Sequence, residues 1–290
     1  MARRPRGLAL NLPLALSLLL ALAGCPGAPV APATPPLGPE ALAALLAEGD
    51  AAWTRRGEPA ELVTALSAWR RAAVARPSQA ELELRLARGE GFRALAAQLP
   101  AEALSAHDAC SRAAERALAA LAPRFAAALL EGRPVGEAAA LVEAPGAEPL
   151  YWLAVGRLGV AQANGPAAVL AVKDHALPLL LRAAALDERL DAAGPLRALG
   201  AWSALLPASA GGGVEAARTR FSRAAELFPD EPWRRVEEAR TLAVLLQDRA
   251  AFVRLLGEVL AAPPATERAA EQAVAKRRAR QWLDKRARLF

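Results

Sequence analysis

Small and large apolar residues recur along the chain after Glu40 at spacings that suit packed helices. In three segments a small residue, a large apolar residue and a second small residue lie 12, 8 and 5 positions before a closing position. Spacings of four and three residues place these side chains on one face of a helix. Proline suits the closing position because it cannot continue a helix. The segments are Ala65–Pro77, Ala176–Glu188 (with Glu in place of Pro) and Ala217–Pro229.

Other segments have the pattern of a first helix in such a pair, in which a Gly allows close approach of a neighbour. Trp152 with Gly156, and Leu196 with Gly200, follow this pattern. The arrangement resembles the tetratricopeptide signature, W-x2-L-G-x2-Y followed by A-x3-F, Ala and Pro. A weaker last pair covers Glu231–Gln247 and Arg249–Leu260.

The closing positions fall at 77, 188, 229 and 263, at intervals equal to or longer than the standard repeat. The repeats are therefore degenerate and contain insertions. A final helix, Ala265–Leu289, is a candidate cap for the last repeat. The sequence predicts an all-α fold over residues 40–290, a tetratricopeptide-like helical-hairpin solenoid with a C-terminal capping helix. Further helices are expected at Gln79–Leu99, Ala101–Ala122, Phe125–Glu131 and Val135–Leu141.

Composition supports this fold, since Ala, Leu and Arg dominate and Ile is absent. The formal charge is +6, and removal of Arg3, Arg4 and Arg6 with a leader would leave +3. The remaining basic residues are mixed with acidic ones, so the charge does not indicate a nucleic-acid partner. The one dense basic run, Lys276–Arg288, is either a solvated helix face or a contact for an anionic surface.

The N-terminus has the three parts of a bacterial export signal. Basic residues precede an apolar run from Leu8 to Leu22, which is too short to span a membrane readily. The sequence Leu22-Ala23-Gly24-Cys25 then resembles the lipobox of bacterial lipoproteins. We expect residues 1–24 to be a signal peptide and the Cys25 thiol to carry a lipid that anchors the chain to a membrane. The alternative is an ordinary secretory signal with a coincidental cysteine.

Residues 25–39 form a proline-rich tether in this interpretation. Pro26 in place of Asp resembles an outer-membrane sorting signal of enteric bacteria. The expected location is therefore the outer membrane, facing the periplasm, with the inner membrane and the cell surface left open.

Several short motifs follow one another along the chain: Ala113–Leu118, Pro123–Phe125, Leu130–Gly132, Leu150–Ala154, Gly194–Gly200 and Arg223–Pro229. Their order resembles the T-component lipoproteins of tripartite ATP-independent periplasmic (TRAP) transporters. The chain departs from the family pattern at Leu196, where His is frequent, and at Ala193, where Gly is usual. The resemblance implies a helical repeat protein with a concave cleft that partners a periplasmic solute-binding protein and holds a small hydrophobic or carboxylate ligand.

In the repeat frame, the first helices expose Arg157, Arg197 and Leu205 on the concave face. Two arginines on an apolar surface suit a carboxylate. Tyr151 and Trp202 are candidates for an aromatic wall, together with Trp152 and Trp233. The alternatives are solvated or locally paired arginines and aromatic residues that belong to the core.

Catalysis has little support. His107 and His175 lack metal-ligand spacing, and no nucleophile elbow or phosphate loop is present. Cys110 is expected to pack as a small hydrophobic residue. We therefore predict no enzyme activity, no catalytic or metal-binding residues and no cofactor.

The sequence thus favours an accessory binding subunit of a TRAP-type uptake system, which docks a solute-binding protein or another envelope protein. The alternative is a general envelope scaffold lipoprotein that assembles an outer-membrane or cell-wall complex. A homo-oligomer is compatible with either function.

Overall fold

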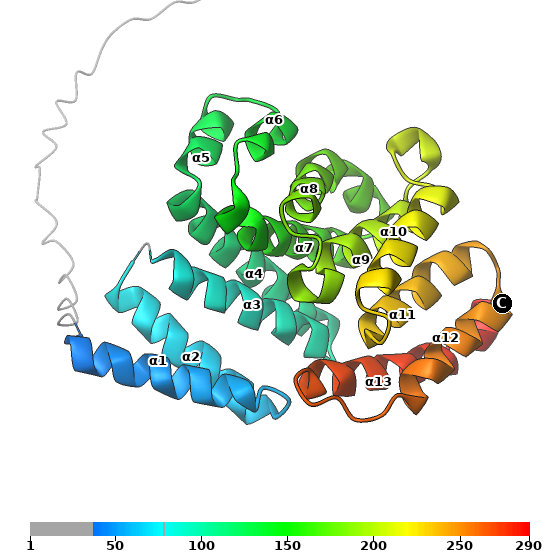
Figure 1. Ribbon diagram of the computed structural model, residues 1–290, viewed down its shortest axis with the longest axis horizontal. Coiled ribbons are helices and arrows are strands. Elements are labelled where there is room, and N and C mark those ends of the chain that lie inside the picture. Colours follow the sequence, from blue (N-terminus) through cyan, green and yellow to red (C-terminus); the bar gives the residue numbers. More distant parts are fainter. Residues whose placement is uncertain (1–36, 78) are drawn as a thin grey trace, which may run out of the picture. The chain divides into compact units, whose positions relative to one another are not determined.

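The computed structural model describes residues 37–77 and 79–290, and this part of the chain is all-α, with no strand (Figure 1). The signal peptide, Cys25 and most of the tether lie outside the described residues. Short 3-10 or π segments accompany the helices at Ala144–Gly146, Ala208–Ala210, Ala239–Ala243 and Arg286–Arg288. The helices are α1 (Pro39–Thr54), α2 (Pro59–Ala75), α3 (Ala80–Ala96), α4 (Pro100–Leu121), α5 (Pro123–Leu130), α6 (Val135–Ala140), α7 (Ala147–Ala163), α8 (Pro166–Leu186), α9 (Leu190–Leu205), α10 (Val214–Leu227), α11 (Pro232–Glu238), α12 (Arg249–Ala261) and α13 (Ala269–Asp284).

Proline defines where many of these helices begin. Its ring fixes φ near the helical value, and the N–H that it lacks would have no partner in the first turn. In a chain so rich in Ala and Leu, prolines divide what would otherwise be long continuous helices into short ones. The helices α1, α2, α4, α5, α8 and α11 each begin at a proline.

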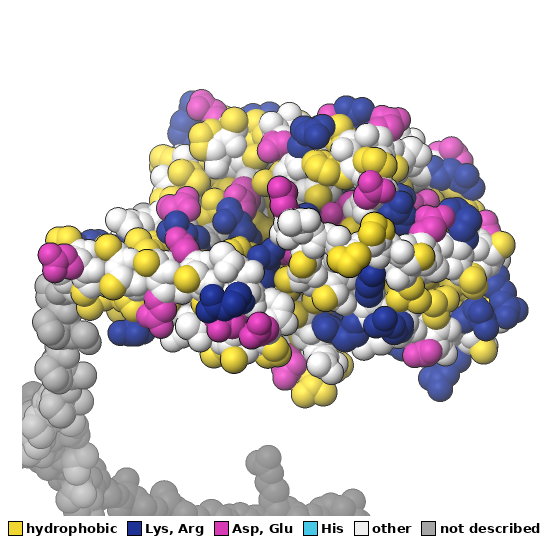
Figure 2. Space-filling model, turned by 60° about the horizontal axis from the view of Figure 1, so that its bottom comes forward, with side chains coloured by type: hydrophobic (Ala, Val, Ile, Leu, Met, Phe, Trp, Pro, Cys, Tyr) yellow, Lys and Arg dark blue, Asp and Glu magenta, His cyan; other side chains and the backbone are white. Residues whose placement is uncertain are grey.

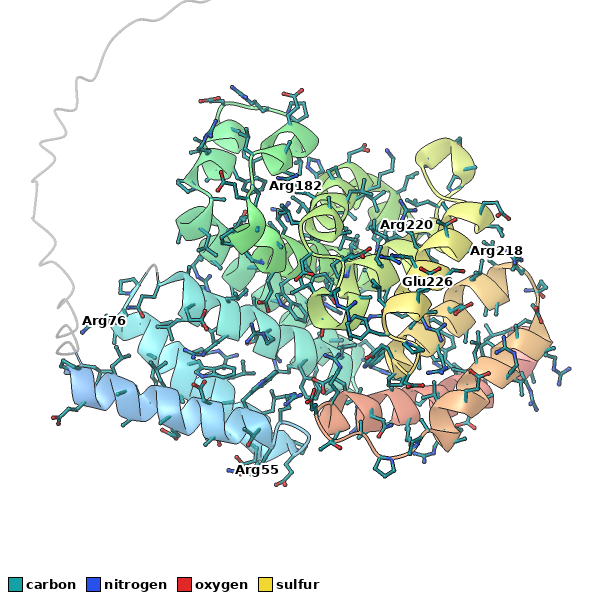
Figure 3. The ribbon with its side chains drawn as sticks, viewed as in Figure 1. Arg55, Arg76, Arg182, Arg218, Arg220 and Glu226 are labelled. Carbon is teal, nitrogen blue, oxygen red and sulfur yellow. The ribbon has the colours of Figure 1, made fainter. Side chains whose placement is uncertain are left out.

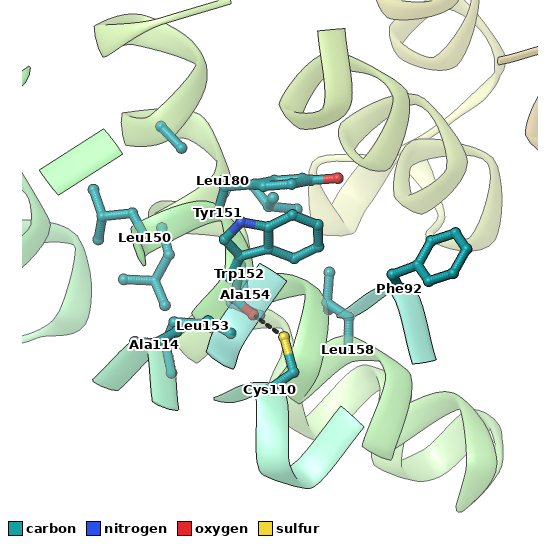
Figure 4. Packing of buried hydrophobic residues seen from close by; sticks show 14 of the residues in the cluster. Phe92, Cys110, Ala114, Leu150, Tyr151, Trp152, Leu153, Ala154, Leu158 and Leu180 are labelled. Carbon is teal, nitrogen blue, oxygen red and sulfur yellow. Dashed lines mark hydrogen bonds between the residues drawn. The ribbon is translucent and has the colours of Figure 1, made fainter. Parts of the chain in front are cut away.

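Neighbouring helices pack in succession: α1 on α2, α3 on α4, α4 on α7, α7 on α8 and α9 on α10. Small residues bring the helices close, and a Cβ added at Gly156 would lie 2.7 Å from the backbone of His107 and of Ser111 in α4. Cys110 lies in this core, with its Sγ 3.5 Å from the Trp152 carbonyl oxygen (Figure 4). Burial raises the pKa of this thiol. The prediction that Cys110 packs as a hydrophobic residue is confirmed.

Arginine side chains also join neighbouring elements of the fold. The Arg182 guanidinium donates to the Val142 carbonyl oxygen, with a distance of 3.0 Å from Nε. Arg220 Nη1 donates to Ser203 Oγ at 2.8 Å. Figure 3 shows both arginines in the half of the molecule that holds α8 to α10. These contacts join residues that lie closer together along the chain than those that the last helix joins.

The last helix, α13, contacts both neighbouring and distant parts of the chain (Figure 1). Val274, Ala275 and Ala279 are buried, and α13 packs on α11 and α12. Arg277 and Arg278 donate to carbonyl oxygens at the C-terminal end of α3, a favourable place for cations. This part of the basic run is therefore neither a solvated face nor free for an anionic surface.

A second link joins the first helices to the last. Arg56, just after α1, makes two hydrogen bonds to Glu271 in α13, at 3.0 and 2.9 Å. Helices from the two ends of residues 37–290 thus meet beside α3. The all-α prediction is confirmed, whereas the relation to tetratricopeptide repeats stays a prediction.

Candidate binding cavity

A cavity of about 630 Å³ lies among α3, α7, α9, α11 and α13. Its volume is in the range of small-molecule sites. One part of its lining is aromatic, and the Tyr151 and Trp152 rings are 4.7 Å apart between centroids. Trp53 and Phe92 meet edge to face at 5.9 Å. The aromatic lining residues are Trp53, Phe92, Tyr151, Trp152, Trp202, Trp233 and Trp282.

The other part of the lining is charged and centres on Asp191. Its Oδ2 accepts from the Tyr151 hydroxyl at 2.9 Å and from Arg197 Nη2 at 3.1 Å. Its Oδ1 accepts from Arg268 Nη1 at 3.0 Å. Burial raises the pKa of Tyr151, and the charge of Asp191 adds to this effect. Tyr151 therefore acts as a neutral donor.

An unusual backbone presents Asp191 to these partners. Asp191, Ala192 and Ala193 have φ of 46°, 53° and 58°, in the left-handed region that favours glycine. Such strain persists only where the surroundings fix it, and it concentrates at functional sites. The family that the sequence resembles usually has Gly at the position of Ala193. The left-handed φ of Ala193 gives a physical reason for that preference.

Glu231 is the second anion of this network, and its side chain is almost fully buried. Its oxygens lie 3.6 Å from Arg197 Nη1 and 3.4 Å from Arg268 Nε. Arg197 is only 5% exposed. Burial alone would lower the pKa of Arg197, but Glu231 and Asp191 outweigh it and raise that pKa. The buried Arg197 and the partly exposed Arg268 thus share two carboxylates.

Two further arginines in the lining are fully paired. Arg88 makes two hydrogen bonds to Glu148, each 2.9 Å long. Arg56 binds Glu271 in the same two-point way, and its guanidinium lies 4.6 Å from the centre of the Trp53 ring. Bidentate pairs of this kind hold side chains in fixed positions.

Buried polar atoms without a hydrogen-bond partner gather at this cavity. Among the described residues seven side-chain atoms are of this kind, and five belong to residues that line it. Folded proteins satisfy nearly all such groups, so this concentration indicates a place where a bound molecule completes the hydrogen bonding. The five atoms are His107 Nδ1, Arg197 Nε, Trp233 Nε1, Glu237 Oε2 and Arg268 Nε.

Burial also changes the ionisation of two of these groups. It lowers the pKa of His107 to about 4, so the imidazole is neutral near pH 7. It raises the pKa of Glu237, although the charges of Arg197 and Arg240 oppose this effect. Glu237 and Arg240 flank the start of a π turn at Ala239–Ala243, a feature frequent at functional sites.

The structure brings together three of the five residues expected in a cleft: Tyr151, Arg197 and Trp202 all line the cavity. The other two lie elsewhere. Arg157 lines a different, shallower hollow and pairs with Glu115 at 3.3 Å. Leu205, at the end of α9, is 46% exposed and lines neither space.

No sequence pattern indicates that Asp191, Glu231, Glu237, Arg240 or Arg268 are site residues. Asp191 and Glu231 lie close to the start of predicted helices, where acidic residues have an ordinary capping role. Their proximity depends on the tertiary fold.

Within residues 37–77 and 79–290, no three His, Cys, Asp or Glu side chains group together in a way that would hold a metal ion. In the same part of the chain, every helix is too short or too polar to cross a bilayer. Figure 2 shows acidic and basic side chains interspersed over one face, with no large region of a single charge.

These features define an all-α protein with an aromatic and charged cavity of ligand size. A family model described as TRAP transporter T-component matches residues 86–290, and the chain belongs to this family. The match spans α4 to α13 and most of α3, and it includes most of the residues that line the cavity. The family links the chain to TRAP-type transport as an accessory, envelope-associated protein. A comparison with curated proteins found no match.

Proposed function

We propose that this chain is a lipid-anchored periplasmic subunit of a TRAP-type uptake system that binds a small ligand in the central cavity and docks a solute-binding protein. The observation that carries the ligand-binding part is the set of five buried polar atoms without a hydrogen-bond partner in residues that line one cavity. Desolvated polar groups are costly unless a partner satisfies them. The aromatic wall supplies apolar contact area for the rest of the ligand.

Membership of the T-component family supports the accessory role in transport. The docking of a solute-binding protein follows from what such a system needs, since a periplasmic receptor delivers the solute. Acylation of Cys25 is supported by the sequence Leu22-Ala23-Gly24-Cys25 after an apolar run.

The ligand can be sought by native mass spectrometry of the full-length protein purified gently from its own membranes. We expect a bound small molecule in the unmodified protein and none in Ala198→Trp, because Ala198 lines the cavity. The matched control is Ala171→Trp, which places the same indole in the second hollow and should keep the ligand. Retention of the ligand by Ala198→Trp, or its absence from the unmodified protein, would contradict a binding role for the cavity.

The anchor and the partner need a separate experiment. Intact-mass measurement should find acyl groups on Cys25, and Cys25→Ser should release the protein from the membrane fraction. A solute-binding protein should co-purify with the wild-type protein after mild cross-linking. Recovery of outer-membrane or cell-wall assembly proteins instead would favour the scaffold alternative.

A further inference from the structure

Most charged groups that line the cavity already have partners. Arg88 and Arg56 are held by Glu148 and Glu271. Arg278 Nη2 donates to the carbonyl oxygens of Leu95 and Ala97. None of these arginines is free to pair with a ligand without losing an existing contact.

The buried network around Asp191 is also balanced. Arg197 and Arg268 both lie against Asp191 and Glu231, two cations against two anions. A further anion placed between these arginines would have to compete with two carboxylates already there. The recognition of an acidic ligand is therefore better sought at another part of the lining.

Three lining groups on one segment are left without a partner among the described residues. The Glu237 carboxylate makes no hydrogen bond or ion pair, and its Oε2 is buried. The Arg240 guanidinium also makes no hydrogen bond or ion pair in the described structure, although it faces the same cavity. The Trp233 indole N–H is buried without an acceptor, in a residue only 6% exposed.

The helix geometry explains why these groups share a face and still do not satisfy one another. Positions 233, 237 and 240 are four and three residues apart, which is the spacing of one helix face. A π turn begins at Ala239, between Glu237 and Arg240, and departs there from the regular spacing of an α-helix. An acid and a base thus stand on one wall of the cavity without pairing.

Building on the ligand-binding function proposed above, we propose that this face selects a zwitterionic ligand, an α-amino acid with an aromatic side chain. The ligand carboxylate pairs with Arg240 and accepts from the Trp233 N–H, while the ammonium group pairs with Glu237. The side chain lies against the aromatic lining, to which Trp53 and Phe92 contribute. A simple carboxylate would leave Glu237 unpaired, and a simple amine would leave Arg240 and Trp233 unpaired.

The test uses three probes that share a phenyl ring: L-phenylalanine, 3-phenylpropanoate, which lacks the amine, and 2-phenylethylamine, which lacks the carboxylate. Calorimetric titration of the full-length protein should show that phenylalanine binds about tenfold or more tightly than either analogue, as loss of one buried charged contact implies. Equal or tighter binding of 3-phenylpropanoate, or binding of none of the three, would overturn the proposal.

Two variants assign the contacts. Glu237→Gln should weaken phenylalanine binding about tenfold while leaving 3-phenylpropanoate unchanged or tighter. Arg240→Gln should weaken phenylalanine similarly while leaving 2-phenylethylamine unchanged. Arg157→Gln, in the second hollow, is the matched control and should bind all three probes as the unmodified protein does. Loss of all three probes in parallel would indicate a structural effect and contradict these assignments.

Failure of this proposal is distinguishable from failure of the proposed function. If native mass spectrometry finds a ligand that Ala198→Trp displaces, the cavity remains a binding site. This holds even if the ligand is not zwitterionic. The probe series with the unmodified protein decides the ligand class even if a variant does not fold.

Discussion

The central cavity and the second hollow have nearly the same volume, about 630 and 650 Å³, but their linings differ in kind. The central cavity is lined by aromatic rings and paired charges, and five buried polar atoms of its lining residues have no hydrogen-bond partner. The second hollow, between α4, α7 and α8, is lined in equal parts by Ala and Val and by polar residues, among them an exposed His175. Volume alone therefore does not distinguish the two spaces in this protein, whereas unsatisfied polar groups do.

The two arginines expected to act together illustrate this difference. Arg197 is buried between two carboxylates, while Arg157 pairs with the exposed Glu115 at the surface. Removing one member of a buried ion pair leaves an unpaired charge, whereas a surface pair contributes little. Three measurements of stability test whether the two regions differ in this way.

The largest effect is expected for Arg197→Ala. In this variant Arg268 is the one arginine still paired with Asp191 and Glu231. The free energy of unfolding should fall by about 3–5 kcal/mol. Arg157→Ala, the matched control, should cost less than about 1 kcal/mol. Urea unfolding of both variants at pH 7 measures the difference. Equal losses would mean that the network around Asp191 does not hold the cavity together.

A smaller effect is expected from His107, which lines the central cavity, compared with His175 in the second hollow. Burial lowers the pKa of folded His107 to about 4, below its ordinary value of 6.5. The unfolded chain therefore takes up the proton first, and stability falls as the pH drops from about 6.5 to about 4. The loss amounts to at most about 3 kcal/mol, reduced by the partial exposure of the ring.

Thermal unfolding of the wild-type protein and of His107→Gln between pH 7 and pH 4 tests this effect. The wild-type protein should lose more stability over this range than His107→Gln does. His175→Gln should follow the wild-type profile. Identical slopes for the wild-type protein and His107→Gln would contradict burial of a neutral imidazole.

The smallest of the three effects concerns Gly156, which lies between Val155 of the central cavity and Arg157 of the second hollow. In Gly156→Ala the new methyl group would meet the α4 backbone, so α4 and α7 must separate. We expect a loss of about 1–3 kcal/mol. Gly257→Ala in α12 has open space around it and should stabilise the protein by about 1 kcal/mol. If Gly156→Ala left the free energy of unfolding unchanged, α4 and α7 would be able to separate at little cost.

The helices could be predicted from the sequence because their signals are local. The predicted helix Arg249–Leu260 corresponds to α12, Arg249–Ala261, and the expected Val135–Leu141 corresponds to α6, Val135–Ala140. Apolar spacing and proline at helix starts depend only on neighbouring residues. Ala176, Leu180 and Ala183, predicted to share a packed face, are fully buried in α8.

The site could be predicted only in part. The repeat frame predicts Arg197 on the concave face, and Tyr151 and Trp202 are predicted as part of an aromatic wall; all three line the cavity. Asp191 reaches them through a left-handed turn of non-glycine residues, for which the sequence has no signal. Arg268 meets Asp191 across 77 positions of chain, and such contacts are set by the fold as a whole.

The contact between α13 and α3 has a consequence for the order of folding. Arg277 and Arg278 reach carbonyl oxygens about 180 positions earlier in the chain, so this contact closes one of the longest loops that the described residues contain. Such closures lose the most chain entropy and come late in folding. The last helix supplies Glu271, Arg278 and Trp282 to the cavity lining, so the cavity is complete only after α13 has docked. Binding of the ligand proposed above therefore requires a chain that has folded to its last helix.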